Sequence, residues 1–428
     1  MIPTVRPPLD VALGKVRRRI LPLIVAAYVV CYVDRTNIGM AQLRMGEEIG
    51  LGAAGFGLAA GIFFVGYALF EVPSNLMLHR VGARLWIARI MVTWGLLSAA
   101  TGLVTSPETL LLVRFLLGVA EAGFAPGIML YFTFWFPQRE RARMVAIYLA
   151  GIPVSFLIAN PLSGWLVEHA GWRVMFVAEA LPAVLLGVVV WLFLPDGPAQ
   201  ARWLTGEEKA IVQAEVEAEA RPERSVRATL TDPRVLLIAL VSSGGIFAAY
   251  LLSLFLPQMI ERLWTGAGET GIGLISAVPY GVAVIAMLAW SRSSDLTGER
   301  TWHTVIAYLV SATGFAAAAV AGPPLLVLAA LTVAAAGKFA SVPVVYALPT
   351  EFLSGRAAAA GIAMVNSVAH VAAVFGPVLT GWLLQRTGGF DAPMLVAAGY
   401  LVLSAFVAGL LGQAGRRDRE PLHIGGRE

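Results

Sequence analysis

Four ionisable side chains lie inside strongly apolar stretches of this 428-residue chain: Asp34, Arg35, Arg114 and Glu121. A charge at the centre of a lipid bilayer costs roughly 2.5–3.5 kcal/mol, so such residues face a protein interior or an aqueous path. These residue types suit proton exchange by a buried carboxylate, next to arginines that hold an anion through paired hydrogen bonds. The alternative is a structural ion pair between two helices. Four charges at this depth favour the functional interpretation.

The spacing of these residues predicts which of them lie at the same depth. A helical rise of 1.5 Å per residue puts Asp34 roughly 21 Å from the start of its span. Arg114 lies roughly 8 Å from the start of a span that runs the other way, so the two are level and able to pair. Glu121 follows two turns later on the same face as Arg114, near the midplane. Asp34 and Arg35 point about 100° apart around their helix and cannot both face one partner.

The composition is that of a polytopic membrane protein. The chain is 58% hydrophobic and 14% charged, whereas a soluble domain carries roughly 25% charged residues. Its basic residues are spread between apolar segments, which argues against nucleic acid as a partner. The single cysteine, Cys31, excludes an intrachain disulfide and a cysteine-based metal site. We expect no cofactor and no enzymatic activity, because the sequence offers no metal-ligand cluster, phosphate-binding glycine loop or activated nucleophile.

Twelve segments are long and apolar enough to cross a membrane, which takes roughly 20 residues. Arginines gather in alternate connections, which predicts that both termini are cytoplasmic. The longest polar stretch, 195–232, divides a six-helix bundle at 1–194 from a second at 233–428, and Thr205 and Glu208 within it form a capping box that opens a short surface helix. The twelve segments are about 20–40, 54–78, 84–105, 109–134, 142–167, 173–194, 234–260, 270–291, 302–321, 324–348, 357–385 and 391–413.

The two halves of the sequence resemble each other. The motif at Pro161–Trp165 recurs at Pro377–Trp382, and the loop residues Arg80–Gly82 match Leu296–Gly298, in both cases about 216 residues apart. Parallel repeats of this kind place a substrate site near the midplane, between the halves, where it opens alternately to each side. We therefore predict an all-α membrane protein with twelve transmembrane helices in two parallel six-helix repeats.

Polar residues on the second span add candidates to the site. Tyr67, Glu71 and Asn75 follow one another at intervals of four and share a helix face. Tyr67 lies deep enough to touch a substrate. Glu71 suits either the site or the packing of the helix, and the sequence does not separate these two roles.

Three polar residues of the second half lie at mid-depth in their spans. Asn366 and His370 share a face of the eleventh span. An interior histidine is either a satisfied structural group or, beside a cavity, a proton shuttle. Lys338 lies in the middle of the tenth span and needs an anionic partner, which is either a substrate carboxylate or a protein carboxylate such as Glu121.

Several motifs taken together resemble one known family. They are Tyr32–Ile38, Phe70–Asn75, Val81–Trp86, Arg114–Gly123 and Leu348–Arg356. In these segments, and along nearly the whole chain, the sequence resembles the anion:cation symporter family of the major facilitator superfamily. Within that family it is most similar to bacterial tartrate, sugar-acid and phthalate permeases.

The resemblance implies proton-driven uptake of a small organic anion across the bacterial inner membrane, by a monomer. By analogy, the proton carriers would be Asp34 and Glu121, and the substrate site would be lined by Tyr32, Arg35, Tyr67 and Arg114. The main alternative is a proton-coupled antiporter or exporter of organic anions. Such proteins commonly have a fifth span rich in glycine and proline, to which Asn160–Gly164 is a partial likeness, so we favour uptake.

The sequence departs from the family pattern at three places. His79 occupies a loop position where the superfamily usually has aspartate, although the second-half copy keeps Asp295. His370 stands where similar permeases often have asparagine, and Lys338 is unusual in the tenth span. The last two add basic character to the second half of the cavity, which fits either a dianionic substrate or altered proton coupling.

Overall fold

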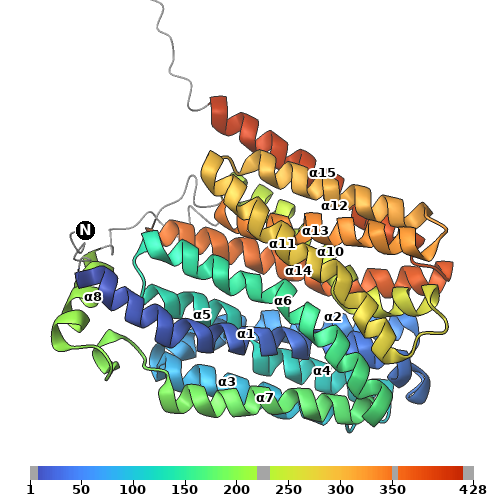
Figure 1. The fold of residues 1–428 in the computed structure, drawn as a ribbon, viewed down its shortest axis with the longest axis horizontal. Coiled ribbons are helices and arrows are strands. Elements are labelled where there is room, and N and C mark those ends of the chain that lie inside the picture. The colour runs from blue at the N-terminus through green and yellow to red at the C-terminus, as the bar shows by residue number, and fades with distance from the viewer. Residues whose placement is uncertain (1–7, 219–231, 349–354, 418–428) are drawn as a thin grey trace, which may run out of the picture.

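The computed structural model describes residues 8–218, 232–348 and 355–417, and its long helices lie side by side along one direction (Figure 1). The helices of the first half are α1 (Pro8–Glu48), α2 (Ala53–Val81), α3 (Ala83–Thr101), α4 (Pro107–Glu121), α5 (Phe124–Thr133), α6 (Gln138–Ala170) and α7 (Trp172–Phe193). A short helix, α8 (Gly206–Ala218), follows. The helices of the second half are α10 (Pro233–Leu263), α11 (Glu269–Thr297), α12 (Thr301–Val320), α13 (Pro324–Ala347), α14 (Gly355–Thr387) and α15 (Asp391–Arg417).

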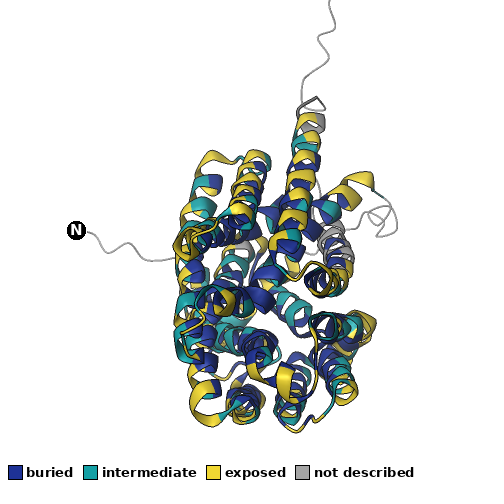
Figure 2. Cartoon of the chain, turned by 90° about the vertical axis from the view of Figure 1, so that its right-hand side faces the viewer, coloured by how far each residue is buried: buried dark blue, intermediate teal, exposed yellow. Residues whose placement is uncertain are grey.

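The outer surface of this bundle suits lipid. Within the described residues, nine helical segments are long and apolar enough to cross a membrane, with α4 and α5 counted as one. Together with α1, α3 and α14, which run alongside them, these make the twelve predicted crossings (Figure 1). The helices turn exposed faces outward and buried faces inward (Figure 2). Large apolar side chains lie on the outward faces, such as Phe193, Phe375 and Phe406, as expected of side chains that contact lipid tails.

The fourth predicted span is one crossing but two helices. α4 ends at Glu121, and α5 begins at Phe124 after Gly123, whose φ of +85° lies in the left-handed region. A side chain at Gly123 would also lie 2.6 Å from Cβ of Ser74 in α2. Glycine tolerates both the dihedral angle and the close approach, so the break is encoded by this residue.

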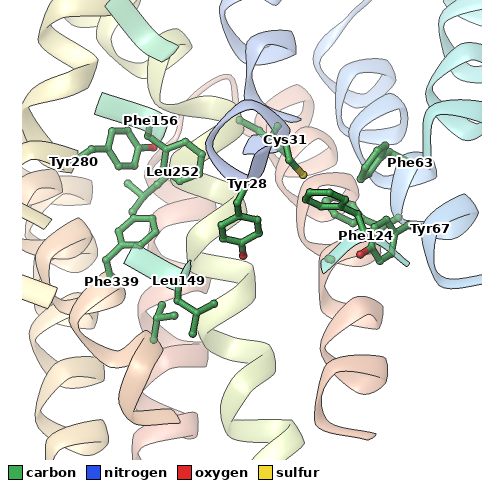
Figure 3. Packing of buried hydrophobic residues seen from close by; sticks show 14 of the residues in the cluster. Tyr28, Cys31, Phe63, Tyr67, Phe124, Leu149, Phe156, Leu252, Tyr280 and Phe339 are labelled. Atoms are coloured by element: carbon green, nitrogen blue, oxygen red, sulfur yellow. The ribbon is translucent and has the colours of Figure 1, made fainter. Parts of the chain in front are cut away.

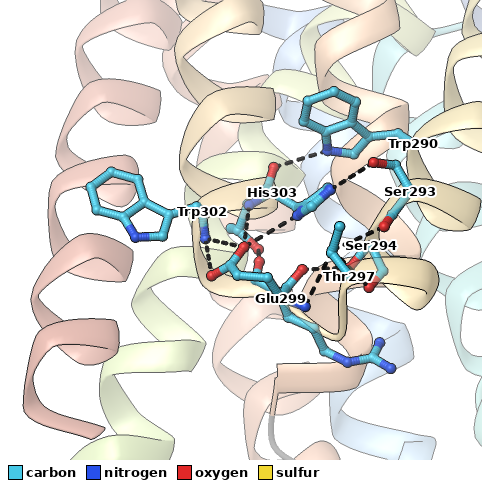
Figure 4. Close-up of polar contacts among 9 residues, drawn as sticks. Trp290, Ser293, Ser294, Thr297, Glu299, Trp302 and His303 are labelled. Atoms are coloured by element: carbon cyan, nitrogen blue, oxygen red, sulfur yellow. Dashed lines mark hydrogen bonds and ion pairs between the residues drawn. The ribbon is translucent and has the colours of Figure 1, made fainter. Parts of the chain in front are cut away.

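The loops between α2 and α3 and between α11 and α12 are built alike, as the repeat predicts. Each turns at a glycine with positive φ, Gly82 at +97° and Gly298 at +66°. In both places a carboxylate satisfies free backbone N–H groups of the next helix, supplied by the segment after α7 in the first case and by the loop itself in the second. Asp196 accepts from the backbone nitrogen of Arg84 at 2.8 Å. Glu299 accepts from the first N–H groups of α12 at 2.8–3.1 Å (Figure 4).

The predicted capping box of α8 is confirmed. The backbone nitrogen of Glu208 donates to Oγ1 of Thr205 at 3.2 Å, and the backbone nitrogen of Thr205 donates to Oε2 of Glu208 at 3.0 Å. Nζ of Lys15 in α1 lies 2.6 Å from Oε1 of Glu208, and this hydrogen bond holds the pKa of the carboxyl below its ordinary value. Trp203 stacks on Trp135 at 5.8 Å between ring centroids. These contacts fasten α8 to the first half.

We call the side where α1 begins and α15 ends the terminal side, and the opposite one the distal side (Figure 1). The two halves meet mainly through α6 against α11 and α2 against α14. Glycines lie at these contacts, and among them Gly381 belongs to the repeated motif. A Cβ at Gly273 would lie 2.9 Å from the carbonyl carbon of Asn160, and one at Gly381 would lie 3.0 Å from Cα of Gly57. Small residues at these positions allow the backbones to touch.

Ionic contacts reinforce the distal side. Arg44 at the end of α1 pairs with Glu269 at the start of α11. Oε2 of Glu168, at the end of α6, accepts from the backbone nitrogen of Thr270 at 2.8 Å, which satisfies a free N–H group at the start of α11. The distal side is thus closed by backbone contact and by charge.

Candidate functional site

A cavity of about 170 Å³ lies between the halves and is lined by α1, α2, α5, α6, α10, α12, α13 and α14. Aromatic side chains make up much of its wall, and Figure 3 shows Phe156 and Phe339 on one side of Tyr28 and Tyr67 on the other. Its charged or titratable lining groups, tyrosines aside, are Arg35, Glu71, Lys338 and His370. An aromatic cavity with few charged groups is the usual form of a small-molecule site.

Arg35 is the cation of the first half that reaches this cavity. Its Nε donates to Oε1 of Glu121 at 2.5 Å, and Nη2 also contacts that oxygen. The guanidinium lies 5.2 Å from the ring centroid of Tyr32 and 5.1 Å from that of Tyr67. Aromatic faces of this kind stabilise a cation where water is scarce. Arg35 therefore lies between Glu121 and the cavity, with access to both.

Glu121 is buried behind Arg35 and does not line the cavity. Sγ of Cys31 donates to the same Oε1 at 3.1 Å, so one carboxylate oxygen holds both partners. The carboxylate also lies at the last residue of α4, where the partial negative charge of the helix end opposes it. The positive charge of Arg35 offsets this repulsion, so the Glu121 carboxylate and the Arg35 guanidinium stabilise each other.

Asp34 faces the other way, into the first half. Its Oδ2 accepts from Nε1 of Trp94 at 2.9 Å and its Oδ1 accepts from Oγ of Ser98 at 3.0 Å, both in α3. The pairing of Asp34 with Arg114 that equal depth allowed is not observed. Nε of Arg114 instead donates to the carbonyl oxygen of Ala59 at 3.4 Å. Depth along a helix fixes height but not direction, and these side chains point to different neighbours.

Arg114 is also off the cavity. Its guanidinium lies 4.9 Å from the ring centroid of Phe63, and the side chain is almost completely buried. Phe63 therefore separates Arg114 from Arg35, whose guanidinium lies 5.6 Å from the same ring.

Lys338 lies on the wall formed by the second half. It is 6% exposed, and within the described residues its ammonium has no ion pair or hydrogen bond. The nearest recorded contact is with the ring of Phe339, at 5.8 Å. Of the two partners considered from the sequence, the Glu121 carboxylate is already engaged by Arg35.

Three more of the predicted site residues line the cavity. Tyr32 and Tyr67 line the cavity, and Tyr32 packs edge-on to Phe156 at 5.8 Å. His370 also lines it, with Nδ1 3.2 Å from Oε2 of Glu71. Asn366 belongs to α14, but its side chain lies outside the part of the chain that is described.

Two features were not anticipated from the sequence. Tyr250 of α10 and Tyr346 of α13 line the cavity, and nothing distinguishes them from other aromatic residues in apolar spans. Glu179 of α7 is 3% exposed and accepts from Oγ of Ser163 at 2.6 Å. A carboxylate inside an apolar span was the signal that selected Asp34, and the same signal would have found Glu179.

Comparisons with known proteins agree with this architecture. The sequence profile described as "Major Facilitator Superfamily" matches residues 24–265 and 263–426. A protein named "Putative tartrate transporter" from Agrobacterium vitis is 46% identical over 412 residues, which is 94% of this chain and 91% of that protein. A "Quinolone resistance transporter" from Acinetobacter baumannii is 40% identical over 87% of this chain and 88% of that protein.

Solved structures support the same fold. A bacterial homologue of the human lysosomal transporter Spinster, in an inward-facing and occupied conformation, superposes with a TM-score of 0.76 at 19% identity, over 95% of this chain and 99% of that one. A D-xylose–proton symporter gives a TM-score of 0.74 at 15% identity, over 91% and 96% of the two chains.

Proposed function

The chain belongs to the major facilitator superfamily, a family of membrane transporters rather than enzymes, and on that premise we propose that it imports a small organic carboxylate together with protons. The cavity between the halves would open alternately to the two sides of the membrane. The tartrate transporter name of a relative 46% identical supports an organic acid as the cargo. Tartrate, a sugar acid and an aromatic acid are the candidate substrates.

The observation that carries the proposal is the position of Arg35 between Glu121 and the cavity. A substrate carboxylate that enters the cavity competes with Glu121 for the same guanidinium. Protonation of Glu121 removes that competitor and frees Arg35 to bind the substrate with two hydrogen bonds. Loss of the proton on the other side restores the Glu121–Arg35 pair and expels the anion. Proton and substrate are thereby bound and released together.

The second half supplies the other anchor. The Lys338 ammonium lines the cavity without an anionic partner among the described residues, so a second substrate carboxylate or a hydroxyl group would pair with it. Tyr32, Tyr67 and His370 line the same cavity as the two cations. We also assign Asn366 to the substrate site, on the same helix face as His370.

Asp34 and Arg114 act behind the cavity wall. We propose Asp34 as a second proton-binding carboxylate, since it is buried with two hydrogen-bond donors on the helix that carries Arg35. Arg114 would meet the substrate only when Phe63, which covers it here, moves aside.

We place the protein in the bacterial inner membrane with the terminal side in the cytoplasm. The terminal side carries most of the loop arginines, as the positive-inside rule requires of the cytoplasmic face. One chain contains the whole cavity, which supports a monomer as the working unit.

An exporter of organic anions, coupled to protons in the opposite direction, is the second candidate. The quinolone resistance transporter that is 40% identical favours it, as does the aromatic wall of the cavity. Direction of transport separates it from the first candidate.

Uptake by proteoliposomes tests both. Labelled tartrate, galactonate, glucarate, phthalate and 4-hydroxyphenylacetate are supplied with and without an inward proton gradient. Gradient-driven accumulation that a protonophore abolishes supports symport. If no acid accumulates and an inward proton gradient instead drives the efflux of preloaded acid, the result supports the exporter.

The variant Glu121→Gln then tests the coupling. It should lose accumulation while retaining exchange of internal for external substrate, because a neutral side chain leaves Arg35 free in both conformations. Glu207→Gln, on the exposed surface of α8, is the matched control and should behave as wild type. Accumulation at the wild-type level by Glu121→Gln would remove this residue from the coupling mechanism.

A further inference from the structure

Two titratable side chains of the cavity face each other across the boundary between the halves. Glu71 belongs to α2 and His370 to α14, and Oε2 of the first lies 3.2 Å from Nδ1 of the second. Both line the cavity, with side chains 14% and 21% exposed. The ring of Tyr67 lies 5.1 Å from the imidazole, between centroids. Within the described residues, neither side chain has another ion pair or hydrogen bond.

We propose that Glu71 and His370 form a further proton-binding site that couples the charge of the cavity to the charge of its ligand. The pair holds one proton either as carboxylate and imidazolium or as two neutral groups, and in both forms its net charge is zero. Without that proton the carboxylate leaves a net charge of −1 on the cavity wall. This inference rests on the proposed function, in that the ligand is taken to be an anion.

The coupling follows from electrostatics in a poorly hydrated space. An anion in the cavity is repelled by the deprotonated pair but not by the protonated one, so anion binding favours proton uptake. By reciprocity, proton uptake at the pair strengthens anion binding by the same factor. The proton is taken from solution on the side where the anion enters and is released where the anion leaves.

The charges around the pair allow it to act as a separate site. Arg35 of α1 is a fixed cation on the cavity wall, and in this structure its charge is offset by Glu121 of α4. Lys338 of α13 lines the same cavity. The other titratable lining groups are the tyrosines Tyr28, Tyr32, Tyr67, Tyr250, Tyr308 and Tyr346.

A purely structural role for the pair, as a fastener between α2 and α14, is the competing interpretation. The two helices already touch through their backbones on the distal side, where a Cβ at Gly61 would lie 2.7 Å from the carbonyl oxygen of Val374. That packing reduces the need for an ionic fastener. The two interpretations differ in the number of protons that accompany the anion.

Proton uptake on anion binding distinguishes them. The full-length protein in nanodiscs is titrated with an acid that the wild type binds, in buffers of different ionisation enthalpy. Glu71→Gln and His370→Gln should each take up one proton fewer per bound anion than wild type. The affinity of each variant for the anion should therefore depend less on pH than that of wild type, by up to about tenfold per pH unit. The exchanged variant, Glu71→His with His370→Glu, keeps the pair and should keep the wild-type count. An unchanged count in both single variants would overturn the inference.

A second readout needs no substrate. Infrared difference spectra between about pH 5 and pH 8, the range in which histidine sites titrate, should show in wild type either a carboxylic acid band that Glu71→Gln lacks or imidazolium bands that His370→Gln lacks. Spectra of both variants identical to that of wild type would refute the proton site. If wild type binds none of the acids, the proposed function fails, while the infrared titration still decides whether the pair binds a proton.

Discussion

Replacement of Gly273 by alanine tests whether the distal side is held shut by backbone contact. The new Cβ would lie 2.9 Å from the carbonyl carbon of Asn160 and nearer still to its oxygen. Ordinary van der Waals contact begins at 3.4 Å, so α11 and α6 must separate by at least 0.5 Å. Both obstacles are backbone atoms of a helix and cannot rotate away.

The energetic consequence can be bounded. Overpacking of a tight interface costs about 1–3 kcal/mol. The cost applies only to the conformation in which α6 and α11 touch, so it shifts the equilibrium toward one in which the distal side is open. A difference of this size changes the population ratio by roughly 5- to 150-fold.

Double electron–electron resonance measures this shift. Spin labels are placed on distal loops at Thr105→Cys and Gly322→Cys, in a Cys31→Ser background that keeps a hydrogen-bond donor to Glu121. The control is Gly281→Ala on the same helix, where the Cβ would lie 3.6 Å from Cδ1 of Leu157, an ordinary contact. Both alanines raise helix propensity alike, so that effect cancels.

The expected result is a longer label-to-label distance in Gly273→Ala than in Gly281→Ala. Equal distance distributions in the two variants, both matching wild type, would show that the glycine contact does not hold the distal side closed.

Three further predictions concern binding and stability. Lys338→Met should weaken binding of a dicarboxylate by roughly 10- to 150-fold, the value of a charged hydrogen bond at about 1.5–3 kcal/mol, and a monocarboxylate of similar shape by far less, as measured by calorimetry. Glu208→Gln should lower the melting temperature at pH 7. Because the pKa of Glu208 is depressed in the folded protein, its contribution is fully present above the ordinary value of 4.5. The difference from wild type should shrink as the pH falls below 4.5 and vanish below the depressed pKa of the folded protein. Trp94→Phe should destabilise the protein by about 1–3 kcal/mol, since it removes a donor from the buried Asp34 carboxylate, and unfolding in denaturant should show the loss.

The positions of the helices were predictable from the sequence, because in a bilayer an apolar segment of sufficient length must satisfy its backbone internally as a helix. The observed helices match the twelve predicted spans, although several extend beyond them: α1, for example, begins at Pro8 rather than near residue 20. Hydropathy marks where lipid begins and not where a helix ends. The break at Gly123 was not predicted, because glycine is common in transmembrane helices without ending them.

The candidate site was predictable in part. The cost of burying charge selected Arg35, Lys338 and Glu121 before any contact was known, and the first two line the cavity. The repeat was visible in the sequence, but only the structure showed that its glycines Gly164 and Gly381 lie at corresponding contacts between the halves. Glu71 remained undecided between two roles, because its sequence neighbours say nothing about α14.

The sequence by itself determined the class of protein and the number of membrane crossings, since these depend on composition and on the fixed rise of a helix. Only the tertiary structure decided which charges meet: Arg35 with Glu121, Asp34 with α3, and Glu71 with His370. The physical reason is that a pairing depends on the rotation of each helix about its axis and on its neighbours. Both are set by the packing of segments that lie far apart in the sequence.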